Sequence, residues 1–245
     1  MLMVDGVDKS YRKRGWFLGE LHPVLRGVSF ACEAGSSLGI IGESGSGKST
    51  LGRLLLGLEK PDRGKVELDG IPVADRRLRG GISAVFQDYA SSINPFFTVE
   101  EAILEPVWRA KQPRREQRRK VDELLRQVGL PSSYGTKFPH ELSGGEAQRV
   151  CIARAIATEP RWIVFDEAVN ALDASVQLQV LDLLKALRVG RGIGYIFITH
   201  DIQAAAYLCD DLVIFKAGRI EERISVGRLA HAQSDYAKKL LRMVI

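Results

Sequence analysis

The sequence predicts an α/β protein built around a mostly parallel, doubly wound sheet, and two observations carry this prediction. An apolar run at 37–41 precedes a glycine-rich segment and then a helical pattern from Leu51 to Leu58. Further along, strand-like and helical runs alternate, at 162–165, 174–189, 195–199, 202–208 and 212–215. Such alternation indicates parallel pairing, because each helix carries the chain back to the edge where the next strand starts.

The other segments predict further strands and a helical lobe. Strand patterns lie at 2–11, 24–32, 65–68 and 82–86, and a basic then apolar insert occupies 12–22. From 98 to 158 the pattern is mainly helical, with breaks at Pro106, Pro113, Pro131 and Pro139. We find no internal repeat. We therefore expect one domain, 1–245, in which an α-helical subdomain at about 87–158 is inserted between the core segments 1–86 and 159–245.

The composition is that of an ordinary globular protein, with 245 residues, 45% of them hydrophobic, and a formal net charge of +5. No apolar run is long enough to span a bilayer, and residues 1–5 lack the features of a signal peptide. Cys32, Cys151 and Cys209 are widely spaced and contain no C-x-x-C pair. We therefore expect a reducing, cytoplasmic compartment, with neither a disulfide framework nor a cysteine metal site.

The densest basic cluster lies at 111–120, around the start of an amphipathic helical pattern. The solvated face of a helix is the favoured interpretation, and attraction to anionic lipid headgroups is the next. Nucleic acid comes third, because no aromatic residue lies among these cations. We expect no nucleic-acid partner.

Residues 42–50 read GESGSGKST, a full match to the phosphate-binding P-loop pattern G-x-x-x-x-G-K-[ST]. Glycines let backbone N–H groups turn toward an anion, and a helix N-terminus adds partial positive charge. Lys48 can reach the β- and γ-phosphates, and the Ser49 hydroxyl can bind Mg²⁺. The pattern predicts that a nucleoside triphosphate is bound by Gly42, Glu43, Ser44, Gly45, Ser46, Gly47, Lys48, Ser49 and Thr50.

Two acids, Asp166 and Glu167, end the buried-strand pattern at 162–165. Ligands collect at the carboxyl ends of the strands in sheets of this kind. We expect Asp166 to hold Mg²⁺, directly or through water, and Glu167 to accept a proton from the attacking water as general base. Without the P-loop, a strand that simply exits to solvent would be the better interpretation.

The segment 142–146 reads LSGGE and is followed by Ala147, Gln148 and Arg149. It is similar to the LSGGQ signature motif of ABC-type ATPases, and other motifs of that family follow in order over essentially the whole chain. Gln87 resembles the Q-loop glutamine, Asp173 the D-loop aspartate, His200 the switch histidine and Tyr11 the aromatic residue that stacks on adenine. The resemblance implies ATP and Mg²⁺ as the bound species. It also implies a P-loop NTPase core with an antiparallel β subdomain and an inserted α-helical subdomain.

Each role that the resemblance implies has a physical basis. Gln87 carries a donor and an acceptor on one amide, so it can link Mg²⁺ or water to a mobile loop. His200 can hydrogen-bond a γ-phosphate, and Tyr11 can stack on a base, with packing in its strand as the alternative. The catalytic residues are thus expected to be Glu167, His200 and Gln87, and the metal ligands Ser49, Gln87 and Asp166. Besides the P-loop, the nucleotide contacts are expected from Tyr11, Ser143, Gly144, Gly145 and Asp173.

In this family the P-loop of one subunit and the signature motif of another enclose each ATP. The resemblance therefore implies a second ATPase subunit, identical or homologous, and a dimer that ATP closes and hydrolysis opens. It also implies permease subunits as partners, a substrate-binding protein as an indirect partner, and a peripheral location on the cytoplasmic face of the inner or plasma membrane. Glu146 replaces the usual signature glutamine, and 166–170 reads DEAVN rather than DEPTS. Neither departure removes a group assigned to chemistry, so we expect an active ATPase.

Residues 92–95, SINP, resemble the S-x-N-P segment of ATPase subunits from peptide and nickel importers. Val169 and the run 175–177 are similar to that subfamily too. The insert around Trp16 and Phe17 resembles the second of the two ATPases in such importers, with a long hairpin loop as the alternative. We expect an importer of oligopeptides, dipeptides or nickel, with a metal chelate as a further option and another transported substrate as the alternative.

Two other classes compete with this interpretation. A soluble ABC ATPase of DNA repair or translation would be expected to have a second cassette, a long coiled-coil insertion or zinc-binding cysteines, and the sequence has none of them. A regulatory protein that binds ATP without turnover would be expected to lack Glu167 or His200, and both are present.

Overall fold

The computed structural model describes residues 1–12, 20–78, 80–88, 92–108 and 113–242. The chain divides into two compact units, Met1–Arg79 with Gly194–Ile245, and Gly80–Ile193. The second unit extends beyond the helical segment expected at about 87–158 at both ends. The insert residues Trp16 and Phe17 lie outside the described residues.

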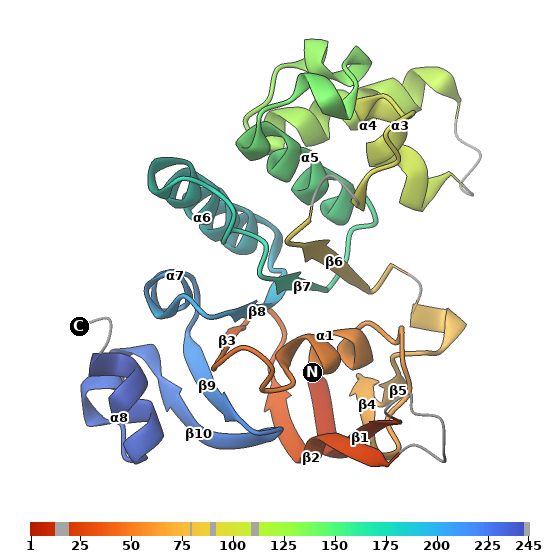
Figure 1. Ribbon diagram of the computed structural model, residues 1–245. Helices are drawn as coiled ribbons and strands as arrows, with labels where there is room; N and C mark the ends of the chain where they lie inside the picture. The colour runs from red at the N-terminus through yellow and green to blue at the C-terminus, as the bar shows by residue number, and fades with distance from the viewer. Residues whose placement is uncertain (13–19, 79, 89–91, 109–112, 243–245) are drawn as a thin grey trace. The chain divides into compact units, whose positions relative to one another are not determined.

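An antiparallel sheet forms one part of the first unit (Figure 1). Its strand order is β2-β1-β4-β5, and its members are β1 (Leu2–Arg12), β2 (Leu21–Cys32), β4 (Arg63–Leu68) and β5 (Ile71–Pro72). Leu2 is paired with Cys32 on one side and with Leu68 on the other, and all three side chains are buried. The predicted antiparallel β subdomain is therefore confirmed, and β2 starts three residues earlier than its sequence pattern suggested.

The other strands of the first unit are β3 (Ser37–Ile41), β8 (Gly194–Thr199), β9 (Asp211–Lys216) and β10 (Arg219–Ser225). Within this unit they lie in the order β10-β9-β3-β8, with β3 parallel to both neighbours and β10 antiparallel to β9. Every residue of β3 is buried, as the apolar run at 37–41 predicts for a strand covered on both faces. The parallel arrangement predicted from the sequence is confirmed here.

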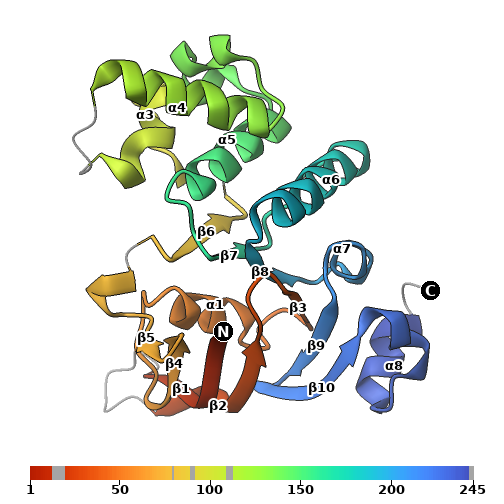
Figure 2. The same cartoon turned by 180° about the vertical axis from the view of Figure 1, so that it is seen from behind.

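The helices of the first unit are α1 (Lys48–Leu55), α7 (Ile202–Leu208) and α8 (Asp235–Arg242), and its short 3₁₀ segments are η1 (Arg76–Leu78) and η5 (Val226–His231). Figures 1 and 2 show α8 beside β10 from opposite sides. Neither β10 nor α8 was among the elements predicted from sequence patterns. Both follow the last predicted strand. β10 pairs with β9 and extends the sheet at that edge, and α8 packs beside β10.

The second unit combines a strand pair with a group of helices (Figure 2). Its elements are β6 (Ile82–Phe86), β7 (Trp162–Asp166), α3 (Val99–Leu104), α4 (Arg114–Gln127), α5 (Gly144–Ile156), α6 (Ala174–Arg191), and the 3₁₀ segments η2 (Glu105–Val107), η3 (Ser132–Thr136) and η4 (Pro139–Glu141). The prolines expected to break the helical region do so. Pro113 precedes α4, Pro131 precedes η3, Pro139 begins η4, and Pro106 lies in η2. Among the described residues, no helix is both long and apolar enough to cross a membrane.

Candidate active site

The P-loop follows β3 directly and is tightly packed on its own unit. A Cβ added to Gly42 would lie 2.1 Å from the carbonyl oxygen of Phe215 in β9. Gly47 has a φ of +107°, and a Cβ there would lie 2.9 Å from the carbonyl oxygen of Val24 in β2. Glycine is required at both positions, because side chains would push the loop off the strands beneath it.

Lys48 lies folded over the loop with only 4% of its surface exposed. Its Nζ donates to the carbonyl oxygens of Gly42 and Glu43, both at 2.8 Å. These bonds hold the ammonium group within the curve of the P-loop. A buried cation in such a place favours an anionic ligand, because carbonyl dipoles offset its charge only in part.

The N-terminus of α1 also suits a phosphate. Gly47 is its N-cap and supplies no side-chain hydrogen bond to the first backbone N–H groups. The Ser46 hydroxyl is buried and, among the described residues, has no hydrogen-bond partner. Backbone N–H groups and hydroxyls that have no hydrogen-bond acceptor at a helix N-terminus are the donors that bind phosphate oxygens. The residues therefore fit the triphosphate that the motif predicts.

Two residues near the end of the chain support the P-loop, and sequence reasoning did not find either. The backbone N–H of Gly218, in the turn after β9, donates to the carbonyl of Ser46 at 2.9 Å. The hydroxyl of Tyr236 in α8 accepts a hydrogen bond from the N–H of Glu43 at 3.2 Å. Gly218 follows Ala217 in a tight turn, and both residues have positive φ. An Ala-Gly pair is only a weak sequence signal for such a turn. No local pattern pointed to Tyr236.

His200 lies at the same end of the parallel sheet as the P-loop. Ile41 and Thr199 are paired in register at the ends of β3 and β8, so Gly42 and His200 leave neighbouring strands at the same level. The side chain of Asp201 caps α7 by accepting from the N–H of Ala204 at 3.0 Å. The register therefore brings together the predicted switch histidine and the P-loop, within one unit.

Tyr11 is linked to the P-loop helix by a polar cluster. Its hydroxyl donates to Glu59 at 2.5 Å, and Arg53 in α1 donates to the same carboxylate at 2.7 Å and to the Thr50 hydroxyl at 3.2 Å. Burial acts to raise the pKa of Glu59, but the bonds from Tyr11 and Arg53 outweigh it and lower that pKa. Tyr11 is thus attached to the helix that begins at Lys48.

The second unit brings together Gln87, Asp166 and Glu167. Phe86 and Asp166 are paired in register at the ends of the parallel strands β6 and β7. Glu167 has a φ of 53°, in the left-handed region that non-glycine residues rarely occupy. Such a backbone costs on the order of 1 kcal/mol or more and is concentrated at functional sites. Here it turns the chain sharply at the residue predicted to be the general base.

The signature segment begins α5 with a capping box. Ser143 is the N-cap, its hydroxyl accepts from the N–H of Glu146 at 3.4 Å, and the Glu146 carboxylate accepts from the N–H of Ser143 at 2.8 Å. Tyr134 donates its hydroxyl to the other oxygen of Glu146 at 2.5 Å. This bond, with those from Ser143, lowers the pKa of Glu146 to about 2. The departure from the usual glutamine therefore leaves an ionised side chain that caps its own helix.

The starts of α5 and α6 lie against each other. A Cβ on Gly145 would lie 2.5 Å from Cγ1 of Val176, and Asp173 is the N-cap of α6. Ser143, Gly144, Gly145 and Asp173 are thus neighbours within the second unit. No group of three or more His, Cys, Asp or Glu side chains suited to a metal occurs among the described residues.

A protein-family model described as ABC transporter matches residues 25–170, which is more than half of the chain. The chain belongs to the ABC transporter family. Its predicted family and ATPase activity are thereby confirmed, and the P-loop described above lies within the matched range.

Curated relatives within the ABC transporter family are ATP-binding proteins of import systems. The chain is 50% identical over 243 residues to the metal-staphylopine import system ATP-binding protein CntF of Staphylococcus aureus, with 98% of each chain covered. It is 40% identical to the nickel import ATP-binding protein NikE of Rhodospirillum rubrum, covering 100% of this chain and 91% of the relative. It is 42% identical to a putative peptide import ATP-binding protein of Brucella abortus, covering 90% and 68%.

Solved structures of the ABC transporter family share the fold. A dimeric structure of the ATP-binding cassette MJ0796, described as a post-hydrolysis state bound to ADP and Pi, matches with a TM-score of 0.81 and 31% identity, covering 92% of this chain and 99% of that one. The structure of cbiO1 from Clostridium perfringens, part of the ABC transporter complex cbiONQ, matches with a TM-score of 0.82 and 28% identity, covering 99% and 93%.

Proposed function

We propose that this chain is the ATP-hydrolysing subunit of an importer whose cargo is a metal chelate, with nickel and peptides as the related alternatives. The observation that carries this proposal is the 50% identity to a metal-staphylopine import ATP-binding protein across 98% of both chains. Similarity along nearly the whole of both chains supports a shared domain arrangement. The two units would then together make one nucleotide-binding domain, with about 87–158 as its inserted helical lobe.

The P-loop residues would bind the triphosphate of ATP. Lys48 is held over the loop at 2.8 Å from two carbonyl oxygens and would contact the β- and γ-phosphates, while the first N–H groups of α1 meet the phosphate oxygens. Tyr11 would stack on adenine. Ser49, Gln87 and Asp166 would hold Mg²⁺, which neutralises phosphate charge when bound. A site with one carboxylate, a hydroxyl and an amide suits this ion, because Mg²⁺ usually keeps waters and phosphate oxygens as its other ligands.

Hydrolysis would use Glu167 as the base that takes a proton from the attacking water, with His200 as the hydrogen-bond donor to the γ-phosphate. Gln87 would orient that water or an Mg²⁺ ligand. Support for this assignment comes from the strand registers, since Phe86 is paired with Asp166 and Ile41 with Thr199. The assigned side chains follow these pairs directly along the chain.

A second ATPase subunit would complete each site. Ser143, Gly144, Gly145 and Asp173 would then serve the nucleotide bound to the partner's P-loop, because an exposed helix N-terminus is an anion-binding end. The capping box at Ser143 keeps that end ordered. A dimeric relative is known in MJ0796, and an identical or a homologous partner would fit here.

Permease subunits would receive the conformational change at the cytoplasmic face of the membrane. The segment 92–97 would contact the permease, because Phe96 is 84% exposed and offers an apolar side chain. Arg154 holds the start of this segment by donating hydrogen bonds to the Ser92 carbonyl and to Glu105. The preceding residues Tyr89, Ala90 and Ser91 lie outside the described residues. A substrate-binding protein would be an indirect partner.

Purification of the tagged chain from detergent-solubilised native membranes, followed by mass spectrometry, tests this proposal. We expect permease subunits and an ATPase partner to co-purify, and the associated binding protein can then be assayed with a metal chelate, free nickel and short peptides. A matched purification of the Phe96→Asp variant should lose the permeases and retain ATP binding. Recovery of DNA-repair or ribosomal partners without any permease would contradict the proposal.

A further inference from the structure

The peptide unit that joins Gly42 to Glu43 is held on both sides. Its carbonyl oxygen, that of Gly42, accepts a hydrogen bond from Lys48 Nζ at 2.8 Å, and its N–H, that of Glu43, donates to the hydroxyl of Tyr236 at 3.2 Å. The first bond lies inside the P-loop, and the second comes from α8, near the other end of the chain. This peptide unit therefore connects α8 to Lys48.

Tyr236 is well placed to hold this peptide unit. Its side chain is 7% exposed, and Lys216 Nζ lies 4.6 Å from the centre of its ring. The neighbouring residues Ala237 and Leu241 are buried as well, which fixes the face of α8 that carries the ring. Burial raises the pKa of the Tyr236 phenol, so its hydroxyl stays protonated and neutral at physiological pH. A neutral hydroxyl accepts a bond from the Glu43 N–H without bringing negative charge near the phosphate site.

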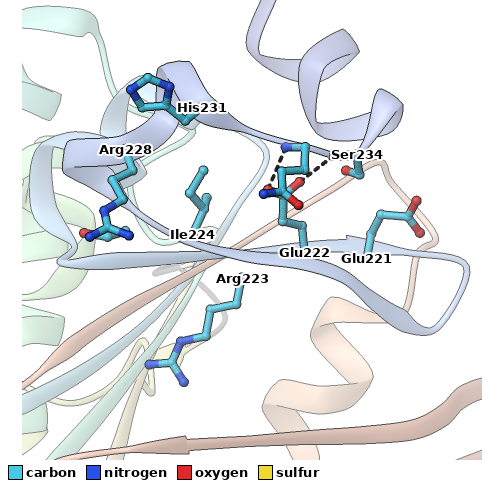
Figure 3. Close-up of a pocket in the computed structure, with 9 residues that line it drawn as sticks. Glu221, Glu222, Arg223, Ile224, Arg228, His231 and Ser234 are labelled. Atoms are coloured by element: carbon cyan, nitrogen blue, oxygen red, sulfur yellow. Dashed lines mark hydrogen bonds between the residues drawn. The ribbon is translucent and has the colours of Figure 1, made fainter.

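Glu222 of β10 is hydrogen-bonded to the turn that precedes α8, and Figure 3 shows its carboxylate directed toward Ser234. The Glu222 carboxylate accepts hydrogen bonds from the N–H groups of Gln233 and Ser234, both at 2.9 Å. The Ser234 hydroxyl then accepts from the N–H of Ala237 at 3.1 Å, at the start of α8. Charge-assisted bonds to backbone N–H groups are among the stronger hydrogen bonds in proteins. They fix the turn that leads into α8, just before Tyr236 in the sequence.

We infer that Tyr236 is a positioning residue for the phosphate contact of Lys48, acting through the peptide unit between Gly42 and Glu43, and that Glu222 supports it by fixing the start of α8. The inference rests on the proposed role of Lys48 in ATP binding. With this peptide unit fixed, the Gly42 carbonyl that accepts a hydrogen bond from Lys48 is already in place before ATP arrives. Preorganisation of this kind strengthens binding, because less order has to be imposed when the ligand binds.

The decisive comparison is ATP affinity in Tyr236→Phe, measured by titration calorimetry without turnover. This variant keeps the ring, its packing and its contact with Lys216, and removes only the hydroxyl. We expect the Kd for ATP to rise about two- to tenfold, the range that loss of one hydrogen bond gives, with little change in melting temperature. Tyr207→Phe, on α7, is the matched control and should leave the Kd unchanged. A Kd for Tyr236→Phe within experimental error of the wild type would overturn the inference.

Glu222→Ala tests the second link without touching the P-loop or Tyr236. It should raise the Kd for ATP in the wild-type background and have no further effect in the Tyr236→Phe background, because both changes break the same connection. Additive effects would contradict the connection. Lys48→Ala separates this inference from the proposed function. If Lys48→Ala weakens ATP binding and Tyr236→Phe does not, only the inference fails; if Lys48→Ala has no effect, the role of Lys48 itself is wrong.

Hydrogen exchange gives a readout that does not depend on affinity. If α8 and the P-loop are coupled, ATP must also stabilise α8, since coupling between two sites is reciprocal. We expect ATP to slow amide exchange in 235–242 of the wild type and to do so less in Tyr236→Phe. Unchanged exchange of α8 on ATP binding to the wild type would overturn the inference.

Discussion

Phe86 and Asp166 are paired in register across the parallel strands β6 and β7. Gln87 and Glu167, the next residue on each strand, therefore leave the sheet at neighbouring positions. Glu167 does so with a φ of 53°, which bends the chain at that point. The two strands thus bring an amide and a carboxylate to one edge of the sheet, which is consistent with the proposed roles of Gln87 and Glu167 in positioning and activating a water.

Glu167→Gln should retain ATP binding and lower the rate of hydrolysis by about 10²- to 10⁴-fold, because the amide keeps the shape and cannot accept the proton. Its ATP-bound form should accumulate as a closed dimer. Steady-state phosphate release and size-exclusion chromatography with ATP measure the two effects. Glu159→Gln is the control, since Glu159 is a second glutamate with positive φ in the same unit. Unchanged hydrolysis in Glu167→Gln would remove Glu167 from the role of base.

Lys48→Ala should weaken ATP binding by about 10- to 100-fold, as expected for the loss of charge-assisted hydrogen bonds to phosphate. The side chain is 4% exposed and is held at the loop by two carbonyls, so its removal takes the cation from the phosphates directly. Lys60→Ala on the exposed surface is the comparison. Equal ATP affinity in wild type and Lys48→Ala, by equilibrium titration, would refute the assignment.

Two glycine substitutions should have opposite effects on the free energy of unfolding. Gly42→Ala should lower it by roughly 1–3 kcal/mol, because the new Cβ would lie 2.1 Å from the Phe215 carbonyl oxygen, a backbone atom that cannot turn aside. Gly190→Ala should raise it by up to about 1 kcal/mol, because nothing lies within 4 Å of the new Cβ in α6 and alanine favours helix. Urea denaturation measures both. A stabilising Gly42→Ala would show that the P-loop is packed differently.

Glu146 should make the free energy of unfolding vary with pH in the acid range. Hydrogen bonds, above all from Tyr134, lower its pKa to about 2 in the folded protein, below the ordinary value of about 4. Because the folded-state pKa is depressed, the stabilisation is fully present above about pH 4 and is lost as the pH falls toward 2. Glu146→Gln should flatten the unfolding free energy in that window. Tyr134→Phe should move the loss to higher pH, whereas an unshifted curve in both variants would contradict the network.

The sequence was most informative where the chemistry is concentrated in consecutive residues. The P-loop at 42–50, the acids at 166–167 and the signature at 142–146 could each be recognised locally. The strands before the P-loop and before the two acids could be predicted from apolar runs, which suit strands covered on both faces. The catalytic and binding roles of these residues stay predictions.

The support beneath the site could not be predicted from the sequence. Tyr236 is 193 residues from Glu43 in the sequence. Their contact depends on β10, a turn and a short helix, none of which a local sequence pattern predicted. The carbonyl of Phe215 beneath Gly42 is a backbone group, so no side-chain motif could reveal it. The role of Tyr134 could not be predicted either, because it depends on the hydrogen bond that its hydroxyl donates to Glu146 in the folded chain. Long-range contacts of this kind are set by packing and leave no trace in residue spacing.

The most direct test of the proposed function is ATP hydrolysis by the purified chain reassembled with its co-purified permeases in lipid vesicles. The assay compares the binding protein loaded with a metal chelate, with nickel or with a peptide against the unloaded protein. We expect one loaded form to stimulate hydrolysis and drive cargo uptake, and Glu167→Gln to abolish both. Hydrolysis that responds to none of the three cargo classes, or that persists in Glu167→Gln, would contradict the account.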